Sequence, residues 1–126
     1  MKTFEIEVST KITVTQEDID DIMSTAFEGG INYWCREVEV IGDYLGEYAS
    51  EQISRGGTLR LYDAEDDFVY ELTLEKLLNG IKKAYNECYY KDYDWCDGKK
   101  IDTYWVDANV ADTIIQLSLF DDVIYG

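Results

Sequence analysis

Apolar and polar residues alternate in the first part of the chain and then change to helical spacing. The alternation from Phe4 to Val14 predicts a strand, bent near Ser9–Thr10. From Thr15 onward apolar residues recur every three or four positions, which predicts a helix that Thr15 caps and Gly29–Gly30 ends. The stripe expected to face the core is Ile19, Ile22, Met23, Ala26 and Phe27.

The middle of the chain predicts strands joined by turns. Residues 31–41 predict a second strand, with room for a bulge, and residues 58–62 and 68–72 predict a β-hairpin around an acidic loop. Gly56–Gly57 predicts a turn before that hairpin, and residues 44–54 predict a short helix. The inward side of this helix would consist of Leu45, Tyr48, Ala49 and Ile53.

Two further helices are predicted in the second half. Thr73 opens the first, which Gly80 should weaken slightly, and Asp107 caps the last, which should pack on the sheet. A loop over residues 89–100 and a strand over residues 103–106 are expected between them. The apolar face of the first helix is Leu74, Leu77, Leu78, Ile81, Tyr85 and Cys88. The apolar positions of the last helix are Val110, Ala111, Ile114, Ile115 and Leu117.

The order of these elements predicts the fold class. Strands and helices do not alternate regularly, and the 126 residues contain no proline, no low-complexity linker and no internal repeat. We therefore expect an α+β fold, as a single acidic domain over residues 1–126 with a mostly antiparallel sheet packed against two or three helices.

The net charge of −16 narrows the choice of partners. It comes from 27 acids against 11 bases, and each half of the chain carries −8. Nucleic acids and anionic membranes would be repelled, whereas basic proteins or cations are favoured. No apolar run is long enough to span a membrane and no signal-peptide pattern is present, so a cytoplasmic protein is expected. The alternative interpretation of the charge is solubility alone.

The residues available for chemistry argue against most catalytic and metal sites. The chain has no histidine, which excludes Ser-His-Asp triads, Cys-His dyads and HExxH zinc sites. Cys35, Cys88 and Cys96 lack C-x-x-C spacing and are expected to be reduced thiols. We expect no cofactor, no metal and no catalytic residue. The alternative is a small enzyme that uses Cys35, which Arg36 follows, or converging carboxylates.

Two features predict a surface for binding a partner. Glu17, Asp20, Asp21 and Glu28 fall on the helix face opposite the apolar stripe, where neighbouring carboxylates lie about 5–6 Å apart, a spacing comparable to that of phosphates along DNA. An ordinary solvated face is the alternative. The hairpin loop adds two further acids, Asp66 and Asp67.

The second feature is an aromatic stretch that includes Tyr90, Tyr93 and Trp95. Tyrosine and tryptophan dominate the hot spots of protein interfaces, although core packing would also explain some of these rings. The local charge is too mixed for a platform that stacks single strands.

Several runs in the chain resemble a known family. Three of them are residues 13–23 (TVTQEDIDDIM), 29–35 (GGINYWC) and 44–50 (YLGEYAS). The other two are residues 55–66, which begin with RGGTL, and residues 111–120, which begin with ADTIIQ. They are similar to small acidic proteins of phages, prophages and conjugative elements of Gram-positive bacteria. The resemblance covers most of the chain except about residues 85–103, and it brings no catalytic residues with it.

The resemblance implies a mobile-element setting, in which small acidic proteins often inhibit host defences. We therefore expect a non-catalytic protein that blocks a basic nucleic-acid-binding defence protein by anti-CRISPR or anti-restriction action, in part through nucleic-acid mimicry. The alternative is a mobile-element accessory protein with another protein partner. The sequence does not indicate an oligomeric state.

Overall fold

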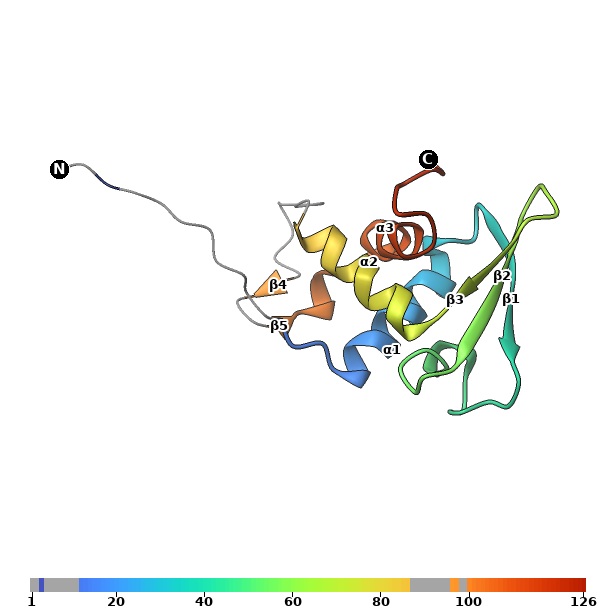
Figure 1. Ribbon diagram of the computed structural model, residues 1–126, viewed down its shortest axis with the longest axis horizontal. Coiled ribbons are helices and arrows are strands. Elements are labelled where there is room, and N and C mark those ends of the chain that lie inside the picture. The colour runs from blue at the N-terminus through green and yellow to red at the C-terminus, as the bar shows by residue number, and fades with distance from the viewer. Residues whose placement is uncertain (1–2, 4–11, 87–95, 98–99) are drawn as a thin grey trace.

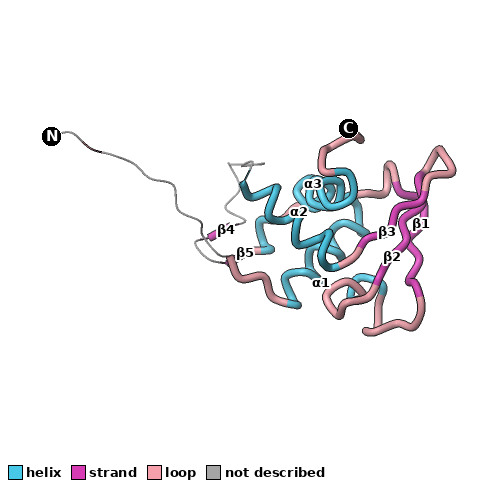
Figure 2. The backbone as a smooth tube through the Cα atoms, in the orientation of Figure 1, coloured by secondary structure: helices cyan, strands magenta, loops and turns pink. Residues whose placement is uncertain are grey.

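In the computed structural model, a three-stranded antiparallel sheet lies on one side and the main helices on the other (Figure 1). The structure describes residues 3, 12–86, 96–97 and 100–126. The sheet order is β1 (Cys35–Ile41), β2 (Thr58–Asp63) and β3 (Val69–Leu72), and among the described residues the last α-helix packs on β3 and against the other two α-helices (Figure 2). The α+β class expected from the sequence is therefore confirmed. The predicted strand over residues 4–14 lies mostly outside the described residues.

The first helix, α1 (Gln16–Thr25), begins as the sequence predicts. The Thr15 hydroxyl accepts a hydrogen bond from the Asp18 amide, and the Asp18 carboxylate accepts one from the Thr15 amide, both at 3.0 Å. These reciprocal bonds satisfy two amides that the helix leaves unpaired. The helix continues as a π-helical turn, η1 (Ala26–Gly30), so the glycine pair ends it where expected. A Cβ on Gly30 would lie only 3.0 Å from the Ala108 carbonyl oxygen, which makes this a close approach to the last helix.

The sheet is formed by β1 (Cys35–Ile41), β2 (Thr58–Asp63) and β3 (Val69–Leu72). The β2–β3 hairpin is confirmed, with Leu59 opposite Leu72. The first strand starts later than expected, because the Trp34 and Cys35 amides both donate to the Ile31 carbonyl and form a turn. The expected bulge is present, where the β1–β2 register shifts between Cys35 and Glu37.

Two predicted elements were wrong, and Leu78, predicted on the apolar face of the helix after Thr73, is exposed. Residues 44–54 form only the short 3₁₀ helix η2 (Ala49–Glu51) with turns, and Leu45 and Tyr48 are exposed instead of buried. The Gln52 side chain bonds to the Leu45 amide and the Asp43 carbonyl and so holds this backbone outside a helix, and Gly42 takes a φ of +76° just before the segment. Residues 103–106 form not a strand but the 3₁₀ helix η3 (Thr103–Trp105), because the Asp102 carboxylate caps the Tyr104 amide. The expected loop over residues 89–100 includes part of a small ladder, β4 (Cys96–Asp97) with β5 (Lys100–Ile101), and is otherwise outside the described residues.

The last helix, α3 (Ala108–Phe120), is the centre of the core. Asp107 caps it as predicted, and its expected apolar positions are all buried. It packs against α2 (Leu74–Asn86), η1, α1 and β3. The crossing of α2 and α3 occurs at Gly80, where a Cβ would lie 2.7 Å from the Ile114 carbonyl oxygen. Gly80 is therefore required for close packing, and the interpretation of it as only a weak point of the helix was incomplete.

Candidate protein-binding surface

The acids predicted on the first helix do not form one uniform row. Glu17 and Asp21 are exposed on α1. Asp20 is half-buried: it accepts a 2.6 Å hydrogen bond from the Ser54 hydroxyl and pairs with Arg55 at 3.5 Å. Glu28 is exposed but lies in the π-helical turn, where the α-helical spacing of the row no longer holds. The regular part of the acidic face is therefore Glu17 to Asp21.

The acidic face of α1 continues onto the segment that follows β1. The Arg55 guanidinium lies between Asp20 and Glu51 and forms ion pairs with both, and α1 packs directly against η2. On the other side, the Asp21 carboxylate accepts a 2.9 Å bond from the Thr103 hydroxyl. Since one cation serves two carboxylates, the local charge stays negative. The surface around α1 and η2 is thus acidic and cross-linked by hydrogen bonds.

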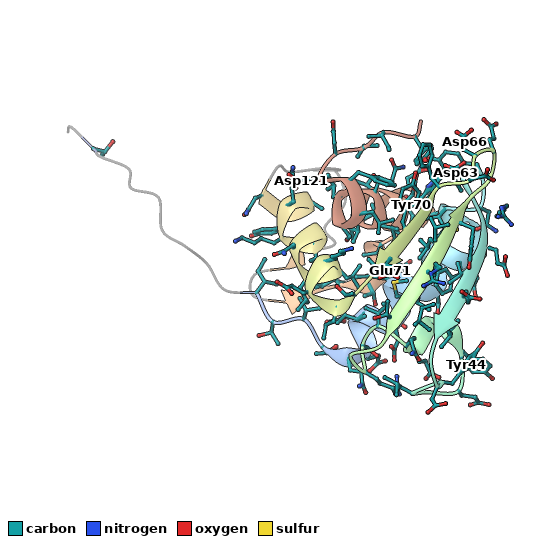
Figure 3. The ribbon with its side chains drawn as sticks, turned by 45° about the vertical axis from the view of Figure 1, so that its right-hand side comes forward. Tyr44, Asp63, Asp66, Tyr70, Glu71 and Asp121 are labelled. Atoms are coloured by element: carbon teal, nitrogen blue, oxygen red, sulfur yellow. The ribbon has the colours of Figure 1, made fainter. Side chains whose placement is uncertain are left out.

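The acids of the hairpin loop lie on a different part of the surface from those of α1. Asp66 and Asp67 are exposed at the β2–β3 turn. Asp63 stabilises this turn, because its carboxylate accepts hydrogen bonds from the Glu65 and Asp66 amides at 2.8 and 2.9 Å. Figure 3 shows Asp66 at the opposite end of the sheet from Tyr44. The structure therefore does not bring the hairpin acids into one patch with those of α1.

The predicted aromatic anchors Tyr90, Tyr93 and Trp95 lie outside the described residues, so the aromatic stretch stays a prediction. A different aromatic group appears in the described part of the chain. Tyr44 is 60% exposed and Tyr48 is 61% exposed, in the loop after β1. Their exposure was not predicted because their spacing fitted a buried helical stripe, and Gly46 within the segment was the signal against that helix.

Cys35, the thiol considered for a catalytic role, lies at the start of β1. Cys35 is buried and free, and its Sγ donates to the Glu37 carbonyl oxygen. Burial raises the pKa of this thiol, which keeps it protonated and unreactive at neutral pH. Among the described residues, no group of three or more Cys, Asp or Glu side chains is placed to hold a metal ion.

Asp112 and Gln116, both buried on α3, form a polar cluster inside the core. Asp112 accepts hydrogen bonds from the Trp34 indole at 2.8 Å, the Gln116 amide at 2.9 Å and the Tyr33 hydroxyl at 2.6 Å. Gln116 in turn accepts the Ile124 and Tyr125 amides through its carbonyl oxygen, both at 2.8 Å. Both oxygens of Asp112 are occupied by these donors. The cluster therefore fastens Ile124 and Tyr125 to α3.

No protein-family model, curated protein or solved structure matches this chain. Within the described residues, no helix is long and apolar enough to cross a membrane. The fold and the surface charge define an acidic α+β protein.

Proposed function

We propose that this chain is a non-catalytic binding protein of a mobile genetic element that inhibits a basic nucleic-acid-binding defence protein, such as a CRISPR effector or a restriction enzyme. The observation that carries the proposal is the acidic face of α1, where exposed Glu17 and Asp21 flank the fixed carboxylate of Asp20. The net charge of −16 gives this face a negative field around it.

Such a face would compete with DNA or RNA for the same basic groove. A protein that binds nucleic acid aligns lysines and arginines with phosphates, and its affinity depends on their charge. Carboxylates on successive turns of a helix lie about 5–6 Å apart, close enough to occupy neighbouring cationic positions. Because long-range attraction acts mainly on encounter, the charges should speed association and make it sensitive to salt.

The test is competition for DNA with purified defence proteins, a restriction endonuclease and a CRISPR effector of a Gram-positive host. Displacement of a fluorescent duplex is measured at several salt concentrations. Two variants distinguish the effect of where the acids lie from the effect of the total charge. Each removes three negative charges, so both have a net charge of −13 instead of −16. The first, the α1 variant, removes the charges of the exposed acids of α1 and η1: E17Q/D21N/E28Q. The second neutralises the β2–β3 turn: E65Q/D66N/D67N.

The wild type should displace DNA from at least one of these proteins, and less effectively as salt rises. The α1 variant should lose most of this displacement, and the turn variant should keep it. Equal small losses in both variants would mean that only the overall charge matters. Failure of the wild type to displace DNA from any protein tested would overturn the proposal.

A further inference from the structure

The loop after β1 carries three exposed apolar side chains within five residues. Tyr44 is 60%, Leu45 50% and Tyr48 61% exposed, at the end of the sheet where Figure 3 places Tyr44. Single exposed apolar residues are normal on protein surfaces, whereas a group of them marks an interaction site. We call residues 43–48 the tyrosine loop.

Side chains beneath the tyrosine loop fix its backbone. Gln52, only 1% exposed, accepts the Leu45 amide at 3.0 Å and donates to the Asp43 carbonyl at 3.2 Å. Glu51 accepts the Glu47 and Tyr48 amides at 2.8 and 3.0 Å, and these two bonds lower the pKa of its carboxyl. The inner side of the loop is therefore hydrogen-bonded to the fold, and the apolar side chains are left on its outer side.

Two glycines make these contacts sterically possible. A Cβ at Gly46 would lie 2.7 Å from the Glu51 Cβ, and a Cβ at Gly57 would lie 2.4 Å from the Gln52 amide nitrogen. A larger residue at either position would displace the anchoring side chain. The loop thus lies directly on its two anchoring side chains.

A loop held in this way is suited to binding another protein. Ordering a flexible loop at an interface costs free energy, and a loop that is already fixed avoids most of that cost. Tyrosine adds large amphipathic contact area with few rotatable bonds, which is why it dominates hot spots and antibody paratopes. Tyr44 and Tyr48 thus have the placement of interface anchors.

The charge around the tyrosine loop indicates the kind of partner. Residues 37–51 contain no lysine or arginine. Their acids are Glu37, Glu39, Asp43, Glu47 and Glu51. Arginines outside the segment form ion pairs with three of them, Glu37, Glu39 and Glu51, and the acids within the tyrosine loop itself are Asp43 and Glu47. Through Arg55 this segment is joined to Asp20, so the loop borders the acidic face of α1. A second copy of the chain, also at −16, would be repelled, whereas a basic protein surface would be attracted.

We propose that the tyrosine loop is the anchor by which this chain docks on a basic protein, with Tyr44, Leu45 and Tyr48 entering an apolar depression bordered by lysines or arginines. The inference rests on the proposed function in taking the partner to be basic, and it adds the contact that sets the lifetime of the complex. The acidic face would govern association, and the tyrosine loop would govern dissociation.

The experiment uses the full chain with a photo-crosslinking amino acid at one position at a time. Position 48 tests the tyrosine loop, position 17 tests the acidic face, and position 68 is the matched control. Phe68 is 62% exposed, almost the same as Tyr48, but it follows the β2–β3 turn at the far end of the sheet. The probe is the heparin-retained protein fraction of a Gram-positive lysate, and adducts are identified by mass spectrometry.

The expected result is a basic protein that is crosslinked from position 48 and not from position 68. Unlabelled wild-type protein should compete for this crosslink, and unlabelled Y44A/Y48A should not. The identified protein is then purified for kinetics. Tyr44→Ala and Tyr48→Ala should each raise its dissociation rate by about tenfold or more, and Phe68→Ala by less than about twofold. Melting temperatures of the variants confirm that each remains folded.

The remaining outcomes separate the two proposals. A basic protein crosslinked from position 17 alone would overturn docking through the tyrosine loop and leave the proposed function standing. An adduct at position 48 with a second copy of the chain, or with an acidic protein, would also overturn it. If neither position 17 nor position 48 gave an adduct above the position-68 background, the result would count against both the proposed function and docking through the tyrosine loop.

Discussion

The Tyr125 hydroxyl donates a 2.5 Å hydrogen bond to the Asp63 carboxylate, although the two residues are 62 positions apart. The same hydroxyl lies 2.9 Å from that of Tyr70, and the Tyr125 ring stacks on Trp34 with centroids 5.0 Å apart. Burial, then the bond to Asp63, raises the pKa of Tyr125 well above its usual value. The contact thus ties the segment after α3 to the end of β2 and packs the Tyr125 ring against the core.

Removing the Tyr125 hydroxyl should destabilise the fold. Tyr125→Phe keeps the ring on Trp34 but removes the donor to Asp63, and the expected cost is on the order of 1 kcal/mol in the free energy of unfolding. Urea denaturation measures it. Tyr44→Phe, which removes an exposed hydroxyl elsewhere, is the control and should be neutral. Equal stability of the two variants would show that the hydrogen bond contributes nothing.

The contribution of Asp63 should disappear in acid. The Tyr125 bond and the Asp66 and Glu65 amides lower the pKa of Asp63 below its usual value. A group with a lowered folded-state pKa stabilises the fold above its unfolded pKa, about 3.9, and the effect is lost as pH falls through the folded value. The stability difference between wild type and Asp63→Asn should therefore be constant from about pH 5 to 8 and shrink below about pH 4. Thermal unfolding across this range tests it, and a difference that persists undiminished at low pH would contradict it.

The packing of α2 on α3 should not tolerate a methyl group at position 80. Gly80→Ala would gain about 1 kcal/mol of helix propensity, but its Cβ would meet the Ser118 hydroxyl and the Ile114 carbonyl oxygen at 2.0 and 2.7 Å. The backbone contact cannot be relieved by a side-chain rotation, so a net loss of about 1–3 kcal/mol is expected. Asn79→Ala, on the exposed side of the same helix, should be neutral or slightly stabilising. A Gly80→Ala protein more stable than the wild type would contradict the close crossing.

The parts of the fold that sequence analysis predicted depend on local interactions. The caps at Thr15 and Asp107 use side chains that bond to amides three residues away, and the β2–β3 hairpin joins neighbouring segments. The segment over residues 44–54 was mispredicted because Gln52 bonds to backbone groups seven and nine residues away. Helical periodicity contains no information about such bonds.

The candidate surface was predictable only in part, because it too depends on contacts between residues distant in the sequence. The charge of the α1 face follows from composition and spacing, so Glu17 and Asp21 were found. The pairing of Asp20 with Arg55, 35 positions away, and the distance between Asp66 and α1 depend on tertiary packing. The exposure of Tyr44 and Tyr48 was missed because these residues were assigned to a buried stripe.

The thiol of Cys35 should react slowly in the folded protein. Burial raises its pKa, and the thiolate is the reactive form. Alkylation with iodoacetamide at pH 8, followed by peptide mass spectrometry, should modify Cys35 much more slowly in native protein than in urea. Cys35→Ala should leave partner binding unchanged. Rapid native modification of Cys35, or loss of binding in a stably folded Cys35→Ala protein, would revive the hypothesis of a reactive thiol.

The anchoring of the tyrosine loop by two separate side chains leads to a prediction for individual amides. Gln52→Leu removes the acceptor of the Leu45 amide but leaves Glu51 in place for the Glu47 and Tyr48 amides. Hydrogen exchange at Leu45 should therefore accelerate by about tenfold or more relative to Glu47 and Tyr48.

Glu51→Ala should give the opposite pattern, with faster exchange at Glu47 and Tyr48 and protection kept at Leu45. NMR-detected exchange resolves the three amides in one experiment. Faster exchange at all three in either variant would mean that the loop opens as one unit. Unchanged exchange at Leu45 in Gln52→Leu would mean that Gln52 does not hold the loop, and the preorganisation assumed for docking would be lost with it.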